Sequence, residues 1–243
     1  MWTQIPRSGM LLFNSPATGA RNLWVASLDH LTDARQITFL SGGPVTHAAL
    51  SPDGTQVAYV STQEGNGQIW VATADGSGSR QLTHVSTTAV WPFWSPDGKW
   101  IAFQSNENGH RSISKVSRSG GDPIRVVENG VRGDWSPDGS QIVYDLNNNI
   151  IEIADAVSGK VIRSISAPTT VVSPVWSPDG KQISVTARDA VWIINPANSG
   201  IRLAVQFPSD FQPQFRAAWT SDGTSLIVDR QQRSYRIVLL ENF

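Results

Sequence analysis

A short turn sequence recurs five times along the chain at a nearly constant spacing. Three copies read Trp-Ser-Pro-Asp-Gly, the first has Leu before Ser-Pro-Asp-Gly, and the last reads Trp-Thr-Ser-Asp-Gly. The first hydroxyl residue of each copy stands at 51, 95, 136, 177 and 220, so the spacings are 44, 41, 41 and 43 residues. Pro presets φ and Asp-Gly favours a turn, so each copy predicts a tight turn between two strands. A period near forty residues predicts the blades of a β-propeller.

A sixth, degenerate unit precedes the first copy of the turn. Residues 11–24, LLFNSPATGARNLW, align without gaps with residues 57–70 and 101–114. Alternating apolar residues and β-branched side chains predict four short strands in each unit, and no segment keeps a helical period. Six units of about 41 residues account for all 243 residues. We therefore expect an all-β, six-bladed β-propeller that forms a single domain over residues 1–243.

The last unit is shorter than the others. Its third strand is predicted at Tyr235–Leu239, and the four residues that follow are too few for a fourth strand. An uncovered strand presents unpaired N–H and C=O groups that invite another strand. We expect a last blade without its outer strand, and either a monomer or a dimer through that edge. The short last unit indicates either a piece of a longer parent protein or a ring that closes imperfectly.

Composition excludes several classes of function. The chain has no cysteine, which removes disulfides, thiol nucleophiles and thiolate metal sites. A net charge of −1 gives no attraction to nucleic acid or to an anionic membrane. No apolar run is long enough to span a bilayer, and the first residues lack the pattern of a signal peptide. We expect a soluble chain, cytoplasmic or periplasmic according to its parent protein.

The repeat resembles that of a known family. The pattern W-S-P-D-G-x-x-I-A-F, followed by I/L-W-V and R-Q-L-T, resembles the propeller repeat of the TolB family. It is also similar to propeller domains attached to prolyl oligopeptidase-like peptidases and to some bacterial winged-helix regulators. The resemblance implies a six-bladed propeller that binds a partner, gates access or senses. The G-x-S-x-G elbow of the peptidases is absent from the sequence.

Two repeated residue types have a structural interpretation. The turn aspartates occur once per unit, so they are spread around a rim and are too far apart to act together in catalysis. The aromatic residue before each turn is predicted to lie in the core between blades rather than on a ligand platform. The residues concerned are Asp53, Asp97, Asp138, Asp179 and Asp222, and Trp94, Trp135, Trp176 and Trp219.

No metal or cofactor motif is found in the sequence. The four histidines share no metal-ligand spacing. Residues 145–149 imitate the opening of a calcium loop, but Ile150 replaces the required Gly and Ala156 replaces the bidentate Glu. These residues are therefore predicted to form a tight hairpin. We expect no cofactor, and calcium at the propeller axis remains an alternative that no motif supports.

One position per unit varies while its surroundings repeat. It lies four residues before the first hydroxyl residue of the turn, where the strands are expected to converge on the upper mouth of a central channel. Trp91 is a candidate apolar anchor there, and a pair of arginines suits a carboxylate or a phosphate; solvated or cross-paired arginines are the alternative. The predicted ligand-binding residues are His47, Trp91, Arg132, Asp134, Ser173 and Arg216.

These observations favour a non-catalytic propeller module that binds a protein, a peptide or an anionic ligand at the channel mouth. No residue is assigned a catalytic or metal-binding role. The first alternative is a hydrolase of the lactonase, esterase or phosphotriesterase type with a metal at the propeller axis, for which Asp134 is the main acidic candidate. The second alternative is the sensor domain of a bacterial regulator.

Overall fold

The computed structural model describes residues 3–4, 10–18, 20–27, 30–39, 45–63, 65–107, 109–208, 216–230 and 236–241. Every regular element in these ranges is a β-strand, which confirms the expected all-β fold. Among them there is no helix of the length and apolarity that a membrane span requires. The chain divides into two compact units, Met1–Asn129 and Gly130–Phe243.

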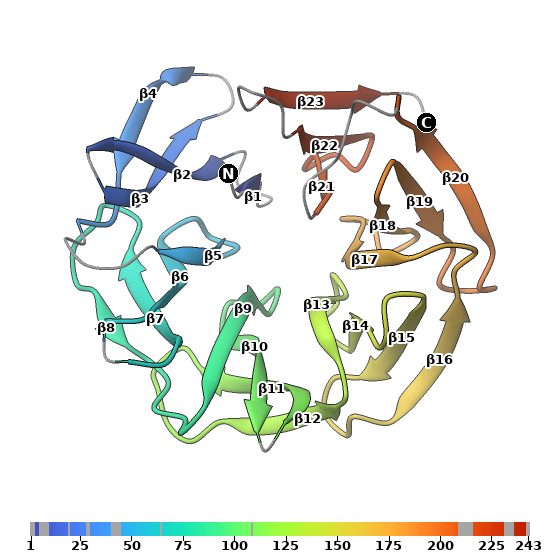
Figure 1. Cartoon of the computed structure of the whole chain (residues 1–243), viewed down its shortest axis with the longest axis horizontal. Coiled ribbons are helices and arrows are strands. Elements are labelled where there is room, and N and C mark those ends of the chain that lie inside the picture. The colour runs from blue at the N-terminus through green and yellow to red at the C-terminus, as the bar shows by residue number, and fades with distance from the viewer. Residues whose placement is uncertain are drawn as a thin grey trace. The chain divides into compact units, whose positions relative to one another are not determined.

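The first unit contains three antiparallel four-stranded sheets in its described part. Within each sheet the strands follow one another in chain order, as Figure 1 shows. The strands are β1 (Thr3–Gln4), β2 (Met10–Thr18), β3 (Ala20–Ser27) and β4 (His30–Gln36); β5 (Thr46–Leu50), β6 (Gln56–Ser61), β7 (Gln68–Thr73) and β8 (Arg80–Gln81); and β9 (Thr88–Trp94), β10 (Trp100–Glu107), β11 (His110–Ser117) and β12 (Ile124–Glu128).

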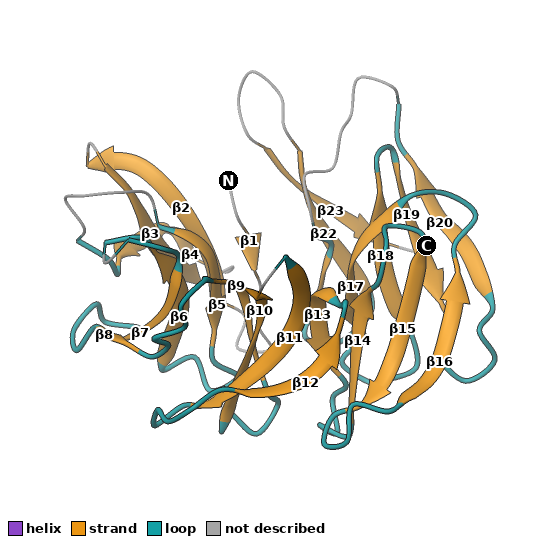
Figure 2. Ribbon diagram, turned by 60° about the horizontal axis from the view of Figure 1, so that its bottom comes forward, coloured by secondary structure: helices purple, strands orange, loops and turns teal. Residues whose placement is uncertain are grey.

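The second unit contains two four-stranded sheets and one three-stranded sheet among its described residues. The strands again run antiparallel to their neighbours, and Figure 2 shows them in a turned view. They are β13 (Val131–Trp135), β14 (Gln141–Asp145), β15 (Ile150–Asp155) and β16 (Val161–Ser166); β17 (Val171–Trp176), β18 (Ile183–Ala187), β19 (Ala190–Ile194) and β20 (Ile201–Gln206); and β21 (Ala218–Trp219), β22 (Ser225–Arg230) and β23 (Arg236–Glu241).

The described residues thus form five complete blades, not the six that the repeat count predicts. Among the described residues the last repeat contributes β21, β22 and β23, which form a three-stranded sheet. The third strand of this repeat runs over Arg236–Glu241 rather than the predicted Tyr235–Leu239, and Tyr235 lies outside the described residues. The division into two compact units does not test the expectation of a single domain over residues 1–243, which stays a prediction.

Each turn is closed by the same pair of side chains. The Ser hydroxyl donates to the Asp carboxylate two residues on, at 2.6 Å for Ser136 and Asp138. The same hydroxyl accepts the backbone N–H five residues on, at 2.9 Å from Gln141. The glycine of every copy has a φ between 67° and 75°, a conformation that a side chain disfavours. These bonds confirm the turn prediction and the structural role of the aspartates.

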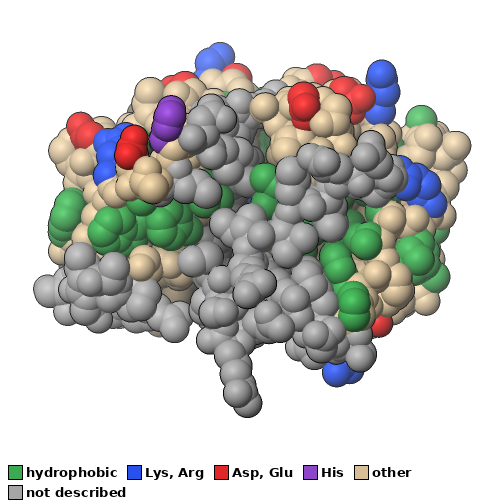
Figure 3. Space-filling view, turned by 90° about the horizontal axis from the view of Figure 1, so that it is seen from above, with side chains coloured by type: hydrophobic (Ala, Val, Ile, Leu, Met, Phe, Trp, Pro, Cys, Tyr) green, Lys and Arg blue, Asp and Glu red, His purple; other side chains and the backbone are tan. Residues whose placement is uncertain are grey.

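The aromatic residue before the turn lies between neighbouring sheets, as predicted. Trp94 and Trp219 are buried, and each indole N–H donates to a backbone carbonyl of the preceding sheet. The acceptors are Ala49 at 3.0 Å and Val175 at 3.2 Å. The hydrophobic core of each unit therefore lies between adjacent sheets. On the face of the molecule shown in Figure 3, hydrophobic side chains lie among polar and charged ones.

The hydrogen bonds to the turn carboxylates lead us to expect that the free energy of unfolding falls in acid. The hydroxyl of Ser51 and the backbone N–H of Thr55 donate to Asp53 and lower its pKa from 3.8 to about 2. A lowered pKa in the folded state adds stability above the ordinary pKa, and this stability is lost as the pH falls to the folded value. We expect the free energy of unfolding to decrease between about pH 4 and pH 2, by less than about 1 kcal/mol for the half-exposed Asp53.

Urea unfolding across this pH range tests the prediction. Asp53→Asn should show a shallower pH dependence than the wild type, because its amide does not titrate. The control is Asp122→Asn, since Asp122 is exposed in a loop and is not part of a turn of this type. An unchanged slope in Asp53→Asn would contradict the role given to this carboxylate.

Candidate functional site

The position that varies between repeats lies in a β-bulge. In four first strands of the sheets the pairing register shifts, so that two residues oppose one residue of the next strand. His47 and Ala48 oppose Tyr59, Trp91 and Pro92 oppose Phe103, Arg132 and Gly133 oppose Tyr144, and Ser173 and Pro174 oppose Val185. The opposing side chains are all buried, so the bulge goes around a core residue.

The first residue of each bulge has a left-handed backbone. The φ angles are 47° at His47, 57° at Trp91, 49° at Arg132 and 55° at Ser173. A residue with a side chain pays roughly 1–3 kcal/mol for this conformation, and such strain is concentrated at functional sites. Bulges also redirect side chains beside a site. The structure thus places four of the predicted binding residues in one unusual, repeated conformation.

In the first unit the bulges bring two aromatic rings together. The His47 and Trp91 rings come from β5 and β9, with centroids 4.0 Å apart and planes tilted by 38°. Both side chains are half-buried. Burial lowers the pKa of His47 to about 4, so the imidazole is neutral at pH 7. This pair offers a mainly apolar surface with polar ring nitrogens.

In the second unit Asp134 connects three repeats of the sequence. This residue belongs to β13, and its Oδ2 accepts the backbone N–H of Trp176 at 2.9 Å. Its Oδ1 accepts a hydrogen bond from Arg216 Nη2 at 2.9 Å, across 82 residues of sequence. The Asp134 and Arg216 side chains are each 20% exposed. Asp134 therefore holds Arg216 in place and is itself a partner rather than an isolated acid.

The second predicted arginine is also paired. Arg132 Nη2 donates to Asp145 Oδ2 at 2.6 Å and to Asn148 Oδ1 at 2.8 Å. The Asp145 side chain is 0% exposed and also accepts the N–H of Asn148, which closes the turn from β14 to β15. Residues 145–149 thus form the predicted hairpin. The structure shows the cross-paired arrangement that was the alternative to arginines awaiting an anion.

Unused polar atoms remain beside these pairs. Among the described residues, Arg132 Nε and Ser173 Oγ are buried without a hydrogen-bond partner. A buried polar atom without a partner is costly, and in native proteins it calls for a water, an ion or a ligand. An arginine has five N–H donors, so one ion pair leaves others for a bound group. The bulged strands of the second unit can therefore still bind an acceptor.

The described residues contain no cluster of three or more His, Cys, Asp or Glu side chains placed to bind a metal. The expectation that the protein needs no cofactor stays a prediction, as does the alternative of calcium at the axis. The six predicted binding residues do not form one described group. His47 and Trp91 meet in the first unit, whereas Asp134 and Arg216 meet in the second, where Arg132 pairs with a separate carboxylate.

The sequence analysis did not predict the bulges, although the sequence contains a signal for two of them. Pro92 and Pro174 each stand within an otherwise strand-like segment, two residues before the tryptophan of the turn. Proline lacks the N–H that a ladder needs, so within a sheet it is found at edges and bulges. The pairing of Asp134 with Arg216 has no local signal, because the two residues lie 82 residues apart in the sequence.

Comparison with known proteins identifies the repeat. A family model described as the TolB beta propeller domain matches residues 6–190. Dipeptidyl-peptidase 5 of Porphyromonas gingivalis is 35% identical over 91 residues, which cover 35% of this chain and 13% of that protein. A protein TolB homolog of Chlorobium chlorochromatii is 30% identical over 123 residues, which cover 51% of this chain and 26% of that protein.

A solved structure supports the same fold. TolB from Acinetobacter baumannii superimposes with a TM-score of 0.71 and 22% sequence identity, and the match covers 97% of this chain and 64% of that chain. At this level of identity the likeness shows the fold alone. The matched stretches span about a quarter or less of the two sequence relatives, so the activities of those whole proteins are not transferred to this chain.

The role of Asp134 predicts a measurable loss of stability. Asp134→Ala should lower the free energy of unfolding by roughly 1–3 kcal/mol, because Arg216 and the N–H of Trp176 lose their acceptor. The control is Asp122→Ala, which removes an exposed carboxylate. Chemical denaturation of both variants tests the prediction, and equal stability of the two would contradict it.

The strain at the bulges predicts that glycine at a bulged position increases the stability of the fold. Ser173→Gly should raise the free energy of unfolding by up to about 1 kcal/mol, because glycine adopts positive φ without strain and the unpaired hydroxyl is removed. Ser166→Gly, in the exposed part of β16, should instead lower it by roughly 0.5–1 kcal/mol. A loss in both variants would show that the bulge at Ser173 stores no strain.

Proposed function

The chain belongs to the family of TolB β-propeller domains. We propose that it is a non-catalytic propeller that binds a protein or peptide partner through its bulged strands. The observation that carries the proposal is the left-handed conformation at His47, Trp91, Arg132 and Ser173. Four repeats keep this costly backbone while the side chain on it changes from aromatic to basic to hydroxyl. A structural role alone would favour glycine at each of these positions.

In the first unit the partner would contact the ring pair of His47 and Trp91. A half-buried tryptophan offers a large apolar surface at a low cost in conformational entropy, and tryptophan is enriched among residues that dominate binding energy. Contact with His47 limits the orientations open to the Trp91 ring before any partner arrives. Such preorganisation lowers the entropic cost of binding.

In the second unit the partner would meet charges that are already held in place. Asp134 orients Arg216, and Asp145 orients Arg132. An acidic group of the partner would use the remaining donors of these arginines rather than replace the internal carboxylates. This favours an acidic side chain or an anionic small ligand that binds beside the pairs, with Ser173 as a neighbouring hydroxyl donor.

The proposal includes the overall count of blades. We assign the β21–β22–β23 sheet as an incomplete sixth blade, because its turn sequence and its buried Trp219 repeat those of the five complete blades. On this assignment residues 1–243 form one propeller domain. Proteins named TolB among the relatives support partner binding, and the peptidase relative matches only over a short stretch.

Peptide selection tests the proposal. We expect that linear peptides selected by display on the full chain bind Trp91→Ala at least roughly tenfold more weakly than the wild type. The matched control is Trp100→Ala, which removes a half-buried tryptophan at the turn end of the same sheet. Affinity measured by calorimetry, with thermal unfolding to confirm the fold, separates the two variants.

A second variant tests the role of the paired arginines in the second unit. Arg216→Met should reduce binding of acidic peptides and weaken its dependence on salt, whereas Arg202→Met in the exposed part of β20 should leave both unchanged. Selection of no peptide, or peptides whose affinity falls with Trp100→Ala and not with Trp91→Ala, would contradict the proposal.

A further inference from the structure

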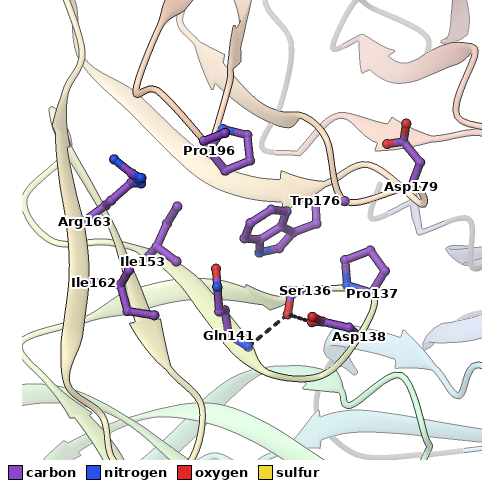
Figure 4. Close-up of a pocket in the computed structure, with 12 residues that line it drawn as sticks. Ser136, Pro137, Asp138, Gln141, Ile153, Ile162, Arg163, Trp176, Asp179 and Pro196 are labelled. Atoms are coloured by element: carbon purple, nitrogen blue, oxygen red, sulfur yellow. Dashed lines mark hydrogen bonds between the residues drawn. The ribbon is translucent and has the colours of Figure 1, made fainter.

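A cavity lies between two sheets of the second unit, at the turn ends of their first strands. Its volume is about 430 Å³, which lies in the range of ligand-binding pockets. The turn that contains Ser136 and Asp138 forms one wall together with Ile153 and Ile162 of β15 and β16. Trp176, at the end of β17, forms the opposite wall, as Figure 4 shows. None of the predicted binding residues at the bulges lines this cavity.

The tryptophan in this cavity differs from two of its counterparts in other repeats. Trp94 and Trp219 donate their indole N–H to a carbonyl of the preceding sheet. Trp176 is only 8% exposed, yet its Nε1 has no hydrogen-bond partner among the described residues. In Figure 4 the indole nitrogen lies on the ring edge that is turned toward Gln141. A buried donor without a described partner therefore lies in the wall of the cavity, on the side of Gln141.

One apolar side chain that lines the cavity is exposed at the surface. Ile162 lines the cavity and is 50% exposed. Val161 and Val157 lie beside it in sequence and are 45% and 84% exposed. Half of the six exposed large hydrophobic side chains in the described ranges thus occur within a single segment of six residues. The exposed side chain of Ile162 offers a ligand in the cavity an apolar surface to bury.

Two donors of the cavity, the Trp176 indole N–H and the Arg163 guanidinium, have no acceptor among the described residues. The Arg163 guanidinium, on β16, lines the cavity and forms no ion pair with any described residue. The carboxylates of Asp138 and Asp179 already accept hydrogen bonds from their own turns. The cavity therefore needs an acceptor near Trp176 and an anionic group near Arg163.

The strand beside the cavity favours a peptide as the occupant. β16 is the last strand of its sheet in the described part of the chain, so one side of its backbone faces no neighbouring strand. An extended peptide can hydrogen-bond to such an edge and place alternate side chains in pockets along it. A small apolar molecule would use the cavity but not this edge.

We infer that this cavity binds an extended peptide segment of a partner protein, in which an apolar side chain is followed by an acidic one. The apolar side chain enters between Ile162 and the ring of Trp176. A main-chain carbonyl of the peptide accepts the indole N–H of Trp176, and the acidic side chain pairs with Arg163. The site is separate from the bulged strands and does not depend on the function proposed for them.

Heteronuclear NMR of the full chain, with isotopically labelled tryptophan side chains, tests the inference. The probe is the capped tripeptide Gly-Phe-Glu, and the controls are Gly-Phe-Lys and Gly-Ser-Glu. The indole N–H signal of Trp176 is assigned as the one of ten that Trp176→Phe removes. Gly-Phe-Glu should shift this signal in a saturable way at about millimolar concentration, and both controls should shift it at least roughly fivefold less.

Matched variants locate the contacts. Arg163→Met should weaken Gly-Phe-Glu binding at least roughly fivefold, because it removes the partner of the acidic side chain. Arg202→Met on β20 is the control and should have no effect, since Arg202 contacts Gln182 and does not line the cavity. No shift of the Trp176 signal, or equal shifts with Gly-Phe-Glu and Gly-Phe-Lys, would overturn the inference. Equal affinities of Arg163→Met and the wild type would overturn it as well.

Discussion

The hydrogen bonds of one serine or threonine hydroxyl in each turn set the geometry on which the rest of the structure depends. In the turn after β13, Ser136 Oγ donates to Asp138 and accepts the N–H of Gln141. A hydroxyl can do both at once, so it fixes the turn and the start of the returning strand together. The strand register follows from the turn, since a one-residue slip would reverse every side chain. Trp135, directly before the turn, is thereby directed into the core.

The same register explains why one position per repeat can vary. The bulge lies at a fixed distance before the turn and opposite a buried residue such as Tyr59 or Phe103. The core side of the sheet is fixed by that buried residue, whereas the bulged residue, His47 or Trp91, is not required for the ladder. Its left-handed backbone costs free energy in each of the four repeats where it occurs. The strained backbone is kept while the side chain on it varies, and for this reason we assign partner binding to these positions.

Local chemistry made much of this fold predictable from the sequence. The turns, the strands and the burial of Trp94 follow from short patterns, since Pro, Asp and Gly each act on the neighbouring backbone. The bonds between sheets did not follow, because they join residues far apart in sequence. Arg216 pairs with Asp134 across 82 residues, and nothing near either residue signals the other. The unpartnered indole N–H of Trp176 is equally invisible in the sequence, where its motif matches that of Trp94.

The backbone conformation at the bulges is the most direct test of this account. In solution, one-bond Cα–Hα couplings and the intraresidue amide-to-Hα contact distinguish positive from negative φ. The account predicts positive φ at His47, Trp91, Arg132 and Ser173, with negative φ at their neighbours Thr46 and Val172. Negative φ at the four bulged residues would contradict it, because the strain and the redirected side chains would then be absent.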